Sequence, residues 1–496
     1  MKKKIFIITI ICSLLLLVGC THRKEWITNA TWDINVRKAL NTLIDNHGGK
    51  EKKNYVIFDF DNTSSIFDVE EQLKVYQLET MAFAIRPDDI YKILAKDLTS
   101  LDKDLSYLGY GKGSYDDWLS DISEAYKKLY DIYGPFDGEE VSESEMLVMM
   151  EDDYWKEFAT KMLILYSIVY DNQSADVAYP WGAYWFSGMT SEQVYSLAYH
   201  SHKKYKSIDT CKVKWKSPES IKSKVGIVDT EFICGISVTT NIIELWKAFK
   251  EAGIDVWVCS ASFIDVIRAA VDVWGIHDYI KGITAMTSKT KDGRYINEYD
   301  YESGYAYLAK NNSIWEKGKL ATKAQTQSKG KVIAIQNAIM PYYGKGPIAG
   351  FMDSSGDFNF CTEFKDLKLV VCFNRASRKV TDGGGLISVI ATYQKNVIKK
   401  DLLDTNASSD TLYVLQGRDE NGSRKLRSSD KTIRYSETEK KLFANEDNEK
   451  MLRYIINNDM TISDALDKFS IKTKADDSVL GFEYGFLDTY DGYHSR

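Results

Sequence analysis

The chain has 496 residues, of which 44% are hydrophobic and 27% are charged. This is the composition of a globular protein, and the length allows about two to four domains with a sizeable core. A formal charge of −7 argues against a general nucleic-acid binder, because phosphate backbones are held by basic surfaces, and a total of six histidines argues against a multi-histidine metal cluster.

The chain begins with a segment typical of export. Lysines at 2–4 precede an almost unbroken apolar stretch at 5–18, which is shorter than the roughly 20 residues of a membrane span. The stretch ends in Leu-Val-Gly-Cys, which resembles a bacterial lipobox, so we expect residues 1–19 to be a signal peptide and Cys20 to carry a lipid. An uncleaved anchor helix is the alternative. Residues 20–53 are then a tether and a first helix, and the protein is exported and held at the cell membrane or the outer membrane.

An odd number of cysteines remains beyond this segment. Export permits disulfides, and Cys211 with Cys234 is a candidate pair. Cys259 and Cys372 stand in apolar, strand-like runs, which favour buried free thiols.

The first chemical motif follows an apolar run of strand length at 55–58. Asp59 and Asp61 come two residues apart, and such positions share one face of a strand, where both carboxylates can converge on one ligand. Two close carboxylates repel each other unless a cation or a shared proton intervenes. The pattern predicts a metal-assisted site with a nucleophile and an acid–base group. A strand that enters an Asx turn is the alternative.

The second motif lies at the end of another apolar strand. Apolar residues such as Leu245 and Phe249 recur at helical spacing, and a glycine turn, the strand and small hydroxyl residues at 260–262 follow. This order is typical of a parallel α/β sheet, which binds ligands at the carboxyl ends of its strands. Ser260 is therefore a candidate donor to a phosphate oxygen, unless it only caps the next helix.

Two further motifs follow. Lys331 opens a predicted helix, where a lysine is disfavoured unless an anion lies nearby; a surface lysine is the alternative, and Lys329 competes for the role. Asp353 ends a second apolar strand, and Asp357 follows across a glycine turn. This pair suits a hard cation such as Mg²⁺, with a polar turn as the alternative.

In this order the four motifs resemble the haloacid dehalogenase superfamily of phosphohydrolases, whose pattern is DxDxT, a strand-terminal Ser or Thr, a Lys and DxxxD. A narrower resemblance is to exported phosphorylcholine phosphatase-like and phosphoserine phosphatase-like proteins. It rests on WFSGMT at 185–190, VWVCSAS at 256–262 and LQGRD at 415–419. One departure is Met352, which stands before Asp353 where many relatives have glycine.

The resemblance implies an α/β fold, with a Rossmann-like core around a parallel sheet and a large, mostly helical cap inserted after the first motif. The core then comprises 54–75 with 240–400, and the cap comprises 76–239. Residues 401–496 form a C-terminal extension.

The resemblance also implies roles for the motif residues. Asp59 is the nucleophile that forms an aspartyl-phosphate, and Asp61 is the general acid and base. Asp59, the Asp61 main-chain carbonyl and Asp353 hold Mg²⁺, while Asp357 holds a metal-bound water or orients the motif lysine. Lys331 offsets the charge around the phosphate. The expected substrate contacts are Ser260, Asn62, Glu71, Glu70 and Trp185, the two glutamates for a substrate ammonium and the tryptophan for a cation–π contact.

The expected activity is Mg²⁺-dependent hydrolysis of a small phosphomonoester, namely phosphorylcholine or a related amine phosphate. A general acid phosphatase or a phosphoserine-type phosphatase is the alternative within enzymes. A non-catalytic, lipid-anchored binding module is the alternative from another class. The expected partners are the substrate and a membrane, with no nucleic acid.

Overall fold

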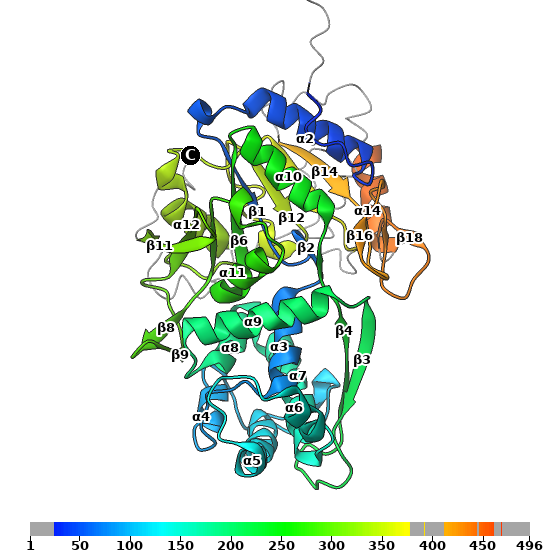
Figure 1. The fold of residues 1–496 in the computed structure, drawn as a ribbon. Coiled ribbons are helices and arrows are strands. Elements are labelled where there is room, and N and C mark those ends of the chain that lie inside the picture. The colour runs from blue at the N-terminus through cyan, green and yellow to red at the C-terminus, as the bar shows by residue number, and fades with distance from the viewer. Residues whose placement is uncertain (1–23, 377–390, 392–410, 444–445, 461–467, 469–496) are drawn as a thin grey trace, which may run out of the picture.

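The computed structural model describes residues 24–376, 411–443 and 446–460, together with residues 391 and 468. The segment that contains Cys20 lies outside the described residues. A sheet covered by helices forms one half of the molecule, and a mostly helical unit forms the other (Figure 1). Within the described part of the chain, no helix is long and apolar enough to cross a bilayer.

The central sheet of the described residues has eight strands. Neighbouring strands pair in parallel from β7 to β14, and β10 and β11 add an antiparallel edge. In spatial order the strands are β11 (Ile314–Ala321), β10 (Tyr305–Lys310), β7 (Gly282–Met286), β6 (Asp255–Phe263), β1 (Tyr55–Phe58), β12 (Ala349–Met352), β13 (Leu369–Phe373) and β14 (Leu412–Gln416). This mixed α/β sheet is consistent with the Rossmann-like core that the sequence predicted.

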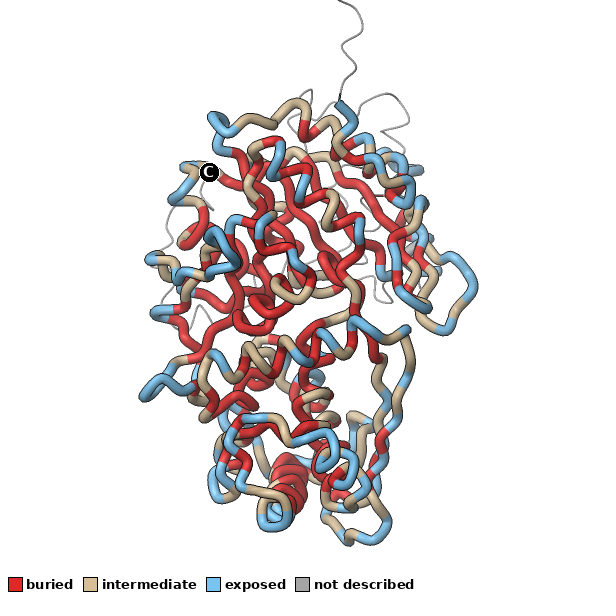
Figure 2. Tube along the Cα trace, viewed as in Figure 1, coloured by how far each residue is buried: buried red, intermediate tan, exposed pale blue. Residues whose placement is uncertain are grey.

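Helices cover both faces of this sheet, which explains why its inner strands are apolar throughout. Val56 and Phe58 of β1 pack in the core under α2 (Ile34–His47) and α10 (Thr240–Glu251). Tyr55 and Ile57 pack under α12 (Lys329–Ala338) on the other face. Figure 2 shows the sheet buried beneath exposed outer helices and turns. The helices are α2 (Ile34–His47), α10 (Thr240–Glu251), α11 (Ile264–Val273), α12 (Lys329–Ala338) and α14 (Glu446–Asn457).

The helical unit, called the cap below, is inserted between β1 and β6. Its outgoing and returning connections pair with each other as β2 (Ser65–Ile66) and β5 (Ser237–Val238). Its hairpin consists of β3 (Cys211–Lys216) and β4 (Asp229–Cys234). Its helices are α3 (Val69–Thr80), α4 (Ile90–Leu94), α5 (Tyr115–Tyr133), α6 (Glu143–Met149), α7 (Asp153–Gln173), α8 (Ala175–Ala183) and α9 (Ser191–Lys206). A mostly helical insertion after the first motif is what the sequence predicted.

Two segments add strands to the core, one within its predicted range of 240–400 and one beyond it. Residues 280–328, which the sequence did not place, supply β7, β10, β11 and the hairpin of β8 (Ser288–Lys291) and β9 (Arg294–Tyr299). Past residue 400, β14 adds to the main sheet, so the core does not end there. A small sheet follows, made of β15 (Arg418–Asp419), β16 (Lys425–Leu426), β17 (Thr432–Ile433) and β18 (Lys440–Lys441).

Short 3₁₀ turns complete the described elements. They are η1 (Lys50–Lys52), η2 (Ser106–Leu108), η3 (Tyr184–Phe186), η4 (His277–Tyr279), η5 (Met340–Tyr342) and η6 (Ser355–Asp357).

Candidate active site

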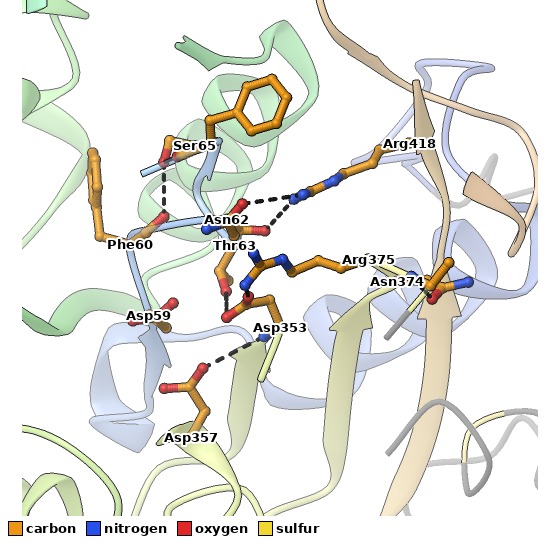
Figure 3. Close-up of polar contacts among 12 residues, drawn as sticks. Asp59, Phe60, Asn62, Thr63, Ser65, Asp353, Asp357, Asn374, Arg375 and Arg418 are labelled. Atoms are coloured by element: carbon orange, nitrogen blue, oxygen red, sulfur yellow. Dashed lines mark hydrogen bonds and ion pairs between the residues drawn. The ribbon is translucent and has the colours of Figure 1, made fainter. Parts of the chain in front are cut away.

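Three carboxylates converge where β1 and its neighbour β12 end. Asp59 follows β1 directly, and its N–H donates to the Phe351 carbonyl of β12 at 3.0 Å. Asp353 follows β12, and Asp357 comes one turn later. One carboxylate oxygen from each of these three aspartates lies within 4.8 Å of the others, so the trio could hold a metal ion. Figure 3 shows the three side chains turned toward one another.

Lys331 is the cation inside this cluster. Its Nζ lies 2.7 Å from Asp59 Oδ1 and 2.5 Å from Asp357 Oδ1, and the side chain is buried. Burial alone would lower the pKa of Lys331, but the two carboxylates outweigh that effect and raise it, so the ammonium stays charged. Lys329 points elsewhere and pairs with Glu363 at 2.6 Å. The choice between the two lysines is therefore settled by position, since only Lys331 meets the cluster.

The cluster carries more negative charge than one ammonium neutralises. Burial raises the pKa of Asp59, and the neighbouring Asp353 raises it further against the lowering effect of Lys331. Burial and Asp59 likewise raise the pKa of Asp357. Buried carboxylates that repel one another are stabilised by a bound cation. The donor set of carboxylate oxygens fits Mg²⁺ in its chemistry.

Asp61 lies beside the cluster and is held separately. Its Oδ2 accepts from the Ser262 hydroxyl at 2.6 Å, and its Oδ1 accepts from the Val69 N–H at 2.7 Å. Burial, followed by repulsion from Asp59, raises the pKa of Asp61 to about 7. The Asp61 side chain is not one of the three carboxylates that could hold a metal ion, and the contact predicted for Asp61 is through its main-chain carbonyl.

A tight turn presents these groups. The Phe60 carbonyl accepts from the N–H groups of Thr63, Ser64 and Ser65 at 3.3, 2.8 and 2.9 Å. Asn62 lies in the left-handed region with φ 61°, which asparagine adopts more readily than most residues. The DFDNT segment thus turns back within five residues of the strand.

Ser262, rather than Ser260, faces the cavity above the cluster. Both serines lie on β6, two residues apart and therefore on one face of the strand. Ser260 is completely buried, and its hydroxyl oxygen accepts from the Ser262 N–H at 3.0 Å. Ser262 stands one step closer to the carboxyl end and lines the cavity with Ala261. The Ser260 hydroxyl also donates to Asp61 Oδ2, at 3.4 Å, so Ser260 lies against Asp61 although it does not line the cavity. Its contact with a phosphate oxygen stays a prediction, and Ser262 is a second candidate for that contact.

The cavity has a volume of about 400 Å³ and lies between the sheet edge and the cap. Asn62, Glu70 and Glu71, predicted to meet the substrate, all line it. The Glu70 carboxylate is already engaged, because it accepts from the Phe263 N–H at 2.6 Å and lies 3.4 Å from Lys74 Nζ. The cap contributes to the lining Tyr110, Tyr166, Tyr170, Tyr179 and Asp171.

Trp185 does not line this cavity, so the prediction that it contacts the substrate is wrong. It lies in the short turn η3, has no exposed surface and packs against Trp181 and Phe83, with ring centroids 6.1 and 6.3 Å away. An aromatic cluster at this spacing is a core of the cap. Tyr179, in the helix α8 that precedes this turn, does line the cavity.

Two arginines of the site were missed. Arg375 follows β13, and its guanidinium donates to Asp353 Oδ2 at 2.8 Å while it lines the same cavity. Arg418 is fully buried and donates to the Asn62 carbonyl at 2.8 Å and to Asn62 Oδ1 at 3.1 Å (Figure 3). Glu420 accepts from Arg418 at 2.7 Å and keeps it in place. Arg418 stands in the LQGRD phrase, whereas no sequence pattern marks Arg375.

Comparisons with known proteins support the fold. No protein-family model matches the chain, and no curated protein matches it. A solved structure that does match is a conserved protein of unknown function from Anaerococcus prevotii DSM 20548. It is 25% identical, the TM-score is 0.66, and the alignment covers 84% of this chain and 100% of that one.

Two further solved structures match more weakly. One is a protein of unknown function from Bordetella pertussis Tohama I, 9% identical with a TM-score of 0.30, covering 65% of this chain and 90% of that one. The other is cytosolic 5'-nucleotidase IIIB bound to cytidine, 11% identical with a TM-score of 0.25, covering 69% of this chain and 78% of that one. At these scores neither similarity carries an argument about the site.

Proposed function

We propose that the protein is a Mg²⁺-dependent phosphomonoester hydrolase of the haloacid dehalogenase type. The observation that carries the proposal is the buried meeting of Asp59, Asp353 and Asp357 with Lys331 at the carboxyl edge of the sheet, with Asp61 held separately beside them. A module that only binds ligands has no need of a second carboxylate in this position.

The ion would be held by Asp59, Asp353 and the Asp61 carbonyl, and when bound it supplies charge that offsets the phosphoryl group. Lys331 fixes the Asp59 carboxylate, which attacks phosphorus and forms an aspartyl-phosphate. The bond from phosphorus to the leaving oxygen breaks, and that oxygen takes the proton of Asp61. Asp61 then accepts a proton from the water that attacks the aspartyl-phosphate, which releases phosphate and restores Asp59.

The substrate class in this proposal is a small amine phosphate, phosphorylcholine included. Support comes from the cavity lining, which includes tyrosine rings together with carboxylates such as Glu71 and Asp171. The chain's own Lys74 ammonium lies 3.8 Å from the centroid of the Tyr166 ring and 3.4 Å from Glu70. Rings and carboxylates in this combination attract an ammonium group.

The test is phosphate release from phosphorylcholine, phosphoethanolamine, phosphoserine and a simple aryl phosphate, with and without Mg²⁺. We expect Mg²⁺-dependent turnover that favours the amine phosphates. Asp59→Asn lowers it by about 10³-fold or more, because the nucleophile is lost. The matched control is Asp88→Asn, a carboxylate exposed on the cap, which should retain full activity.

Other outcomes separate the alternatives. Turnover of only phosphoserine or the aryl ester would keep the mechanism and reject the amine substrate. Folded, Mg²⁺-loaded protein that releases phosphate from none of the esters would favour a binding module. The proposal includes export and lipidation at Cys20, which radiolabelled fatty acid incorporation, lost in Cys20→Ala, would test.

A further inference from the structure

Two cysteines face each other across the hairpin of the cap. Cys211 is the first residue of β3 and Cys234 is the last residue of β4, and the two are direct partners in the antiparallel ladder. Directly opposed residues in such a ladder have Cα atoms about 4.5–5.5 Å apart, which falls inside the roughly 4.4–6.8 Å span of a disulfide. The backbone is therefore already placed for a cross-link.

The two sulfurs differ in access. Cys211 is partly exposed, whereas Cys234 is almost completely buried, and both are free thiols in this structure. Burial, and then the neighbouring Cys211, raises the pKa of the Cys234 thiol to about 12. A disulfide reagent in solution would thus meet Cys211 first. The other described cysteines, Cys259, Cys361 and Cys372, have no exposed surface.

The pair stands where the chain returns from the cap to the sheet. Gln72 of α3 donates to the Ile233 carbonyl at 2.6 Å and accepts from the Gly235 N–H at 3.0 Å. On the other side, Arg424 donates to the Ile208 carbonyl at 2.8 Å and to the Ile236 carbonyl at 3.2 Å. The base of the hairpin is braced from both sides, so the two thiols are held in register.

The hairpin base is also part of a cavity wall. Lys212 and Ile233, the residues next to the two cysteines, line a second cavity of about 650 Å³. This cavity shares Glu71, Asp353 and Arg375 with the candidate active site. A bond between the cysteines would fix one wall of the space that leads to the carboxylate cluster.

We propose that Cys211 and Cys234 form a reversible disulfide under oxidising conditions, which cross-links the base of the cap hairpin, next to the connection that returns to the sheet, and stabilises it. With oxidised glutathione, the Cys211 thiolate attacks one sulfur and releases one reduced glutathione. The Cys234 thiol then loses its proton and attacks the Cys211 sulfur, which releases the second glutathione. The oxidant gains two electrons and two protons, and the proposal does not depend on phosphatase activity.

The experiment uses the reduced full-length chain incubated with oxidised glutathione under native conditions. Free thiols are then alkylated, and the digested peptides are mapped by mass spectrometry. We expect a linked peptide pair that contains Cys211 and Cys234 and that dithiothreitol separates. Cys259, Cys361 and Cys372 serve as internal controls that become alkylated only after unfolding. The apparent Tm should rise by several degrees on oxidation and fall back on reduction.

Cys211→Ser and Cys234→Ser are the matched controls, and oxidation should leave the Tm of both unchanged. A lasting glutathione adduct on Cys211 without the linked peptide would overturn the proposal. So would two unmodified thiols under conditions that oxidise a model dithiol. A linked pair with no rise in Tm would overturn the claim that the bond stabilises the base of the hairpin.

Discussion

At the scale of single residues, Lys331 holds the candidate site together. It is a buried ammonium between two buried carboxylates, 2.7 Å from Asp59 and 2.5 Å from Asp357. Removal of one partner from a buried ion network leaves uncompensated charge, which costs more than the loss of an exposed pair. The same contacts that orient the proposed nucleophile therefore also contribute to folding.

We predict that Lys331→Met lowers the free energy of unfolding by about 3 kcal/mol at neutral pH without added metal. Urea unfolding followed by circular dichroism measures the change. The control is Lys24→Met, which breaks an exposed pair with Glu251 and should change stability by no more than about 0.5 kcal/mol. A loss below about 1 kcal/mol in Lys331→Met would mean that the cluster is less charged than the contacts imply.

At the scale of elements, α9 of the cap packs on α11 of the core through a buried histidine. His202 Nε2 donates to the Val266 carbonyl at 3.1 Å, and burial lowers the pKa of His202 to about 4. An unfolded histidine titrates near pH 6.5. Between these two pH values only the unfolded chain takes up the proton, so this group's contribution to stability is present above pH 6.5 and is lost as the pH falls toward 4.

We predict that protonation of His202 in the unfolded chain lowers the free energy of unfolding by about 2 kcal/mol as the pH falls from 7 to 5. The measurement is urea unfolding of the wild type and of His202→Gln, which cannot titrate, at both pH values. His202→Gln starts less stable but loses less between pH 7 and pH 5. Equal losses in the two proteins would show that the histidine is protonated to the same extent in the folded and unfolded states.

At the scale of the whole molecule, the site is assembled from segments that are far apart in the sequence. Asp59 and Asn62 lie in the turn that follows β1, and Asp353 follows β12. Arg418, which contacts Asn62, is the first residue of β15. Arg418 and Asn62 lie 356 residues apart in the sequence, and their hydrogen bond stabilises the turn that carries Asp59 and Asp61. The C-terminal segment is thus part of the site and not an appendage to it.

The sequence was sufficient for groups whose place follows from strand order. Asp59 and Asp353 end apolar strands, and adjacent parallel strands bring their carboxyl ends to one edge, so their meeting could be predicted. Lys329 and Lys331 lie two residues apart on α12 and therefore point in different directions, and only the structure shows which of them contacts the carboxylates. Trp185 was misplaced because an aromatic residue in a helical segment has the same sequence signal whether it faces a cavity or a core.

Arg375 could not be found because nothing local distinguishes it. It follows a buried strand as many polar residues do, and its contact with Asp353 depends on how β13 lies beside β12. The motif at 256–262 contains both Ser260 and Ser262, and the sequence favours Ser260. Which of the two serines lines the cavity depends on how far β6 extends toward it, and this is set by tertiary packing. The alternation of side chains along a strand does not show it.

The most direct test of the account is whether a phosphoryl group becomes attached to Asp59. In Asp61→Asn the proposed base for the second step is absent, and an aryl phosphate needs little help from an acid in the first. Incubation of this variant with an aryl phosphate and Mg²⁺, followed by acid quench and peptide mass spectrometry, should show the phosphoryl group on the peptide that contains Asp59, and Asp59→Asn should show none. Phosphate release by the wild type together with phosphorylation at another residue would contradict the account.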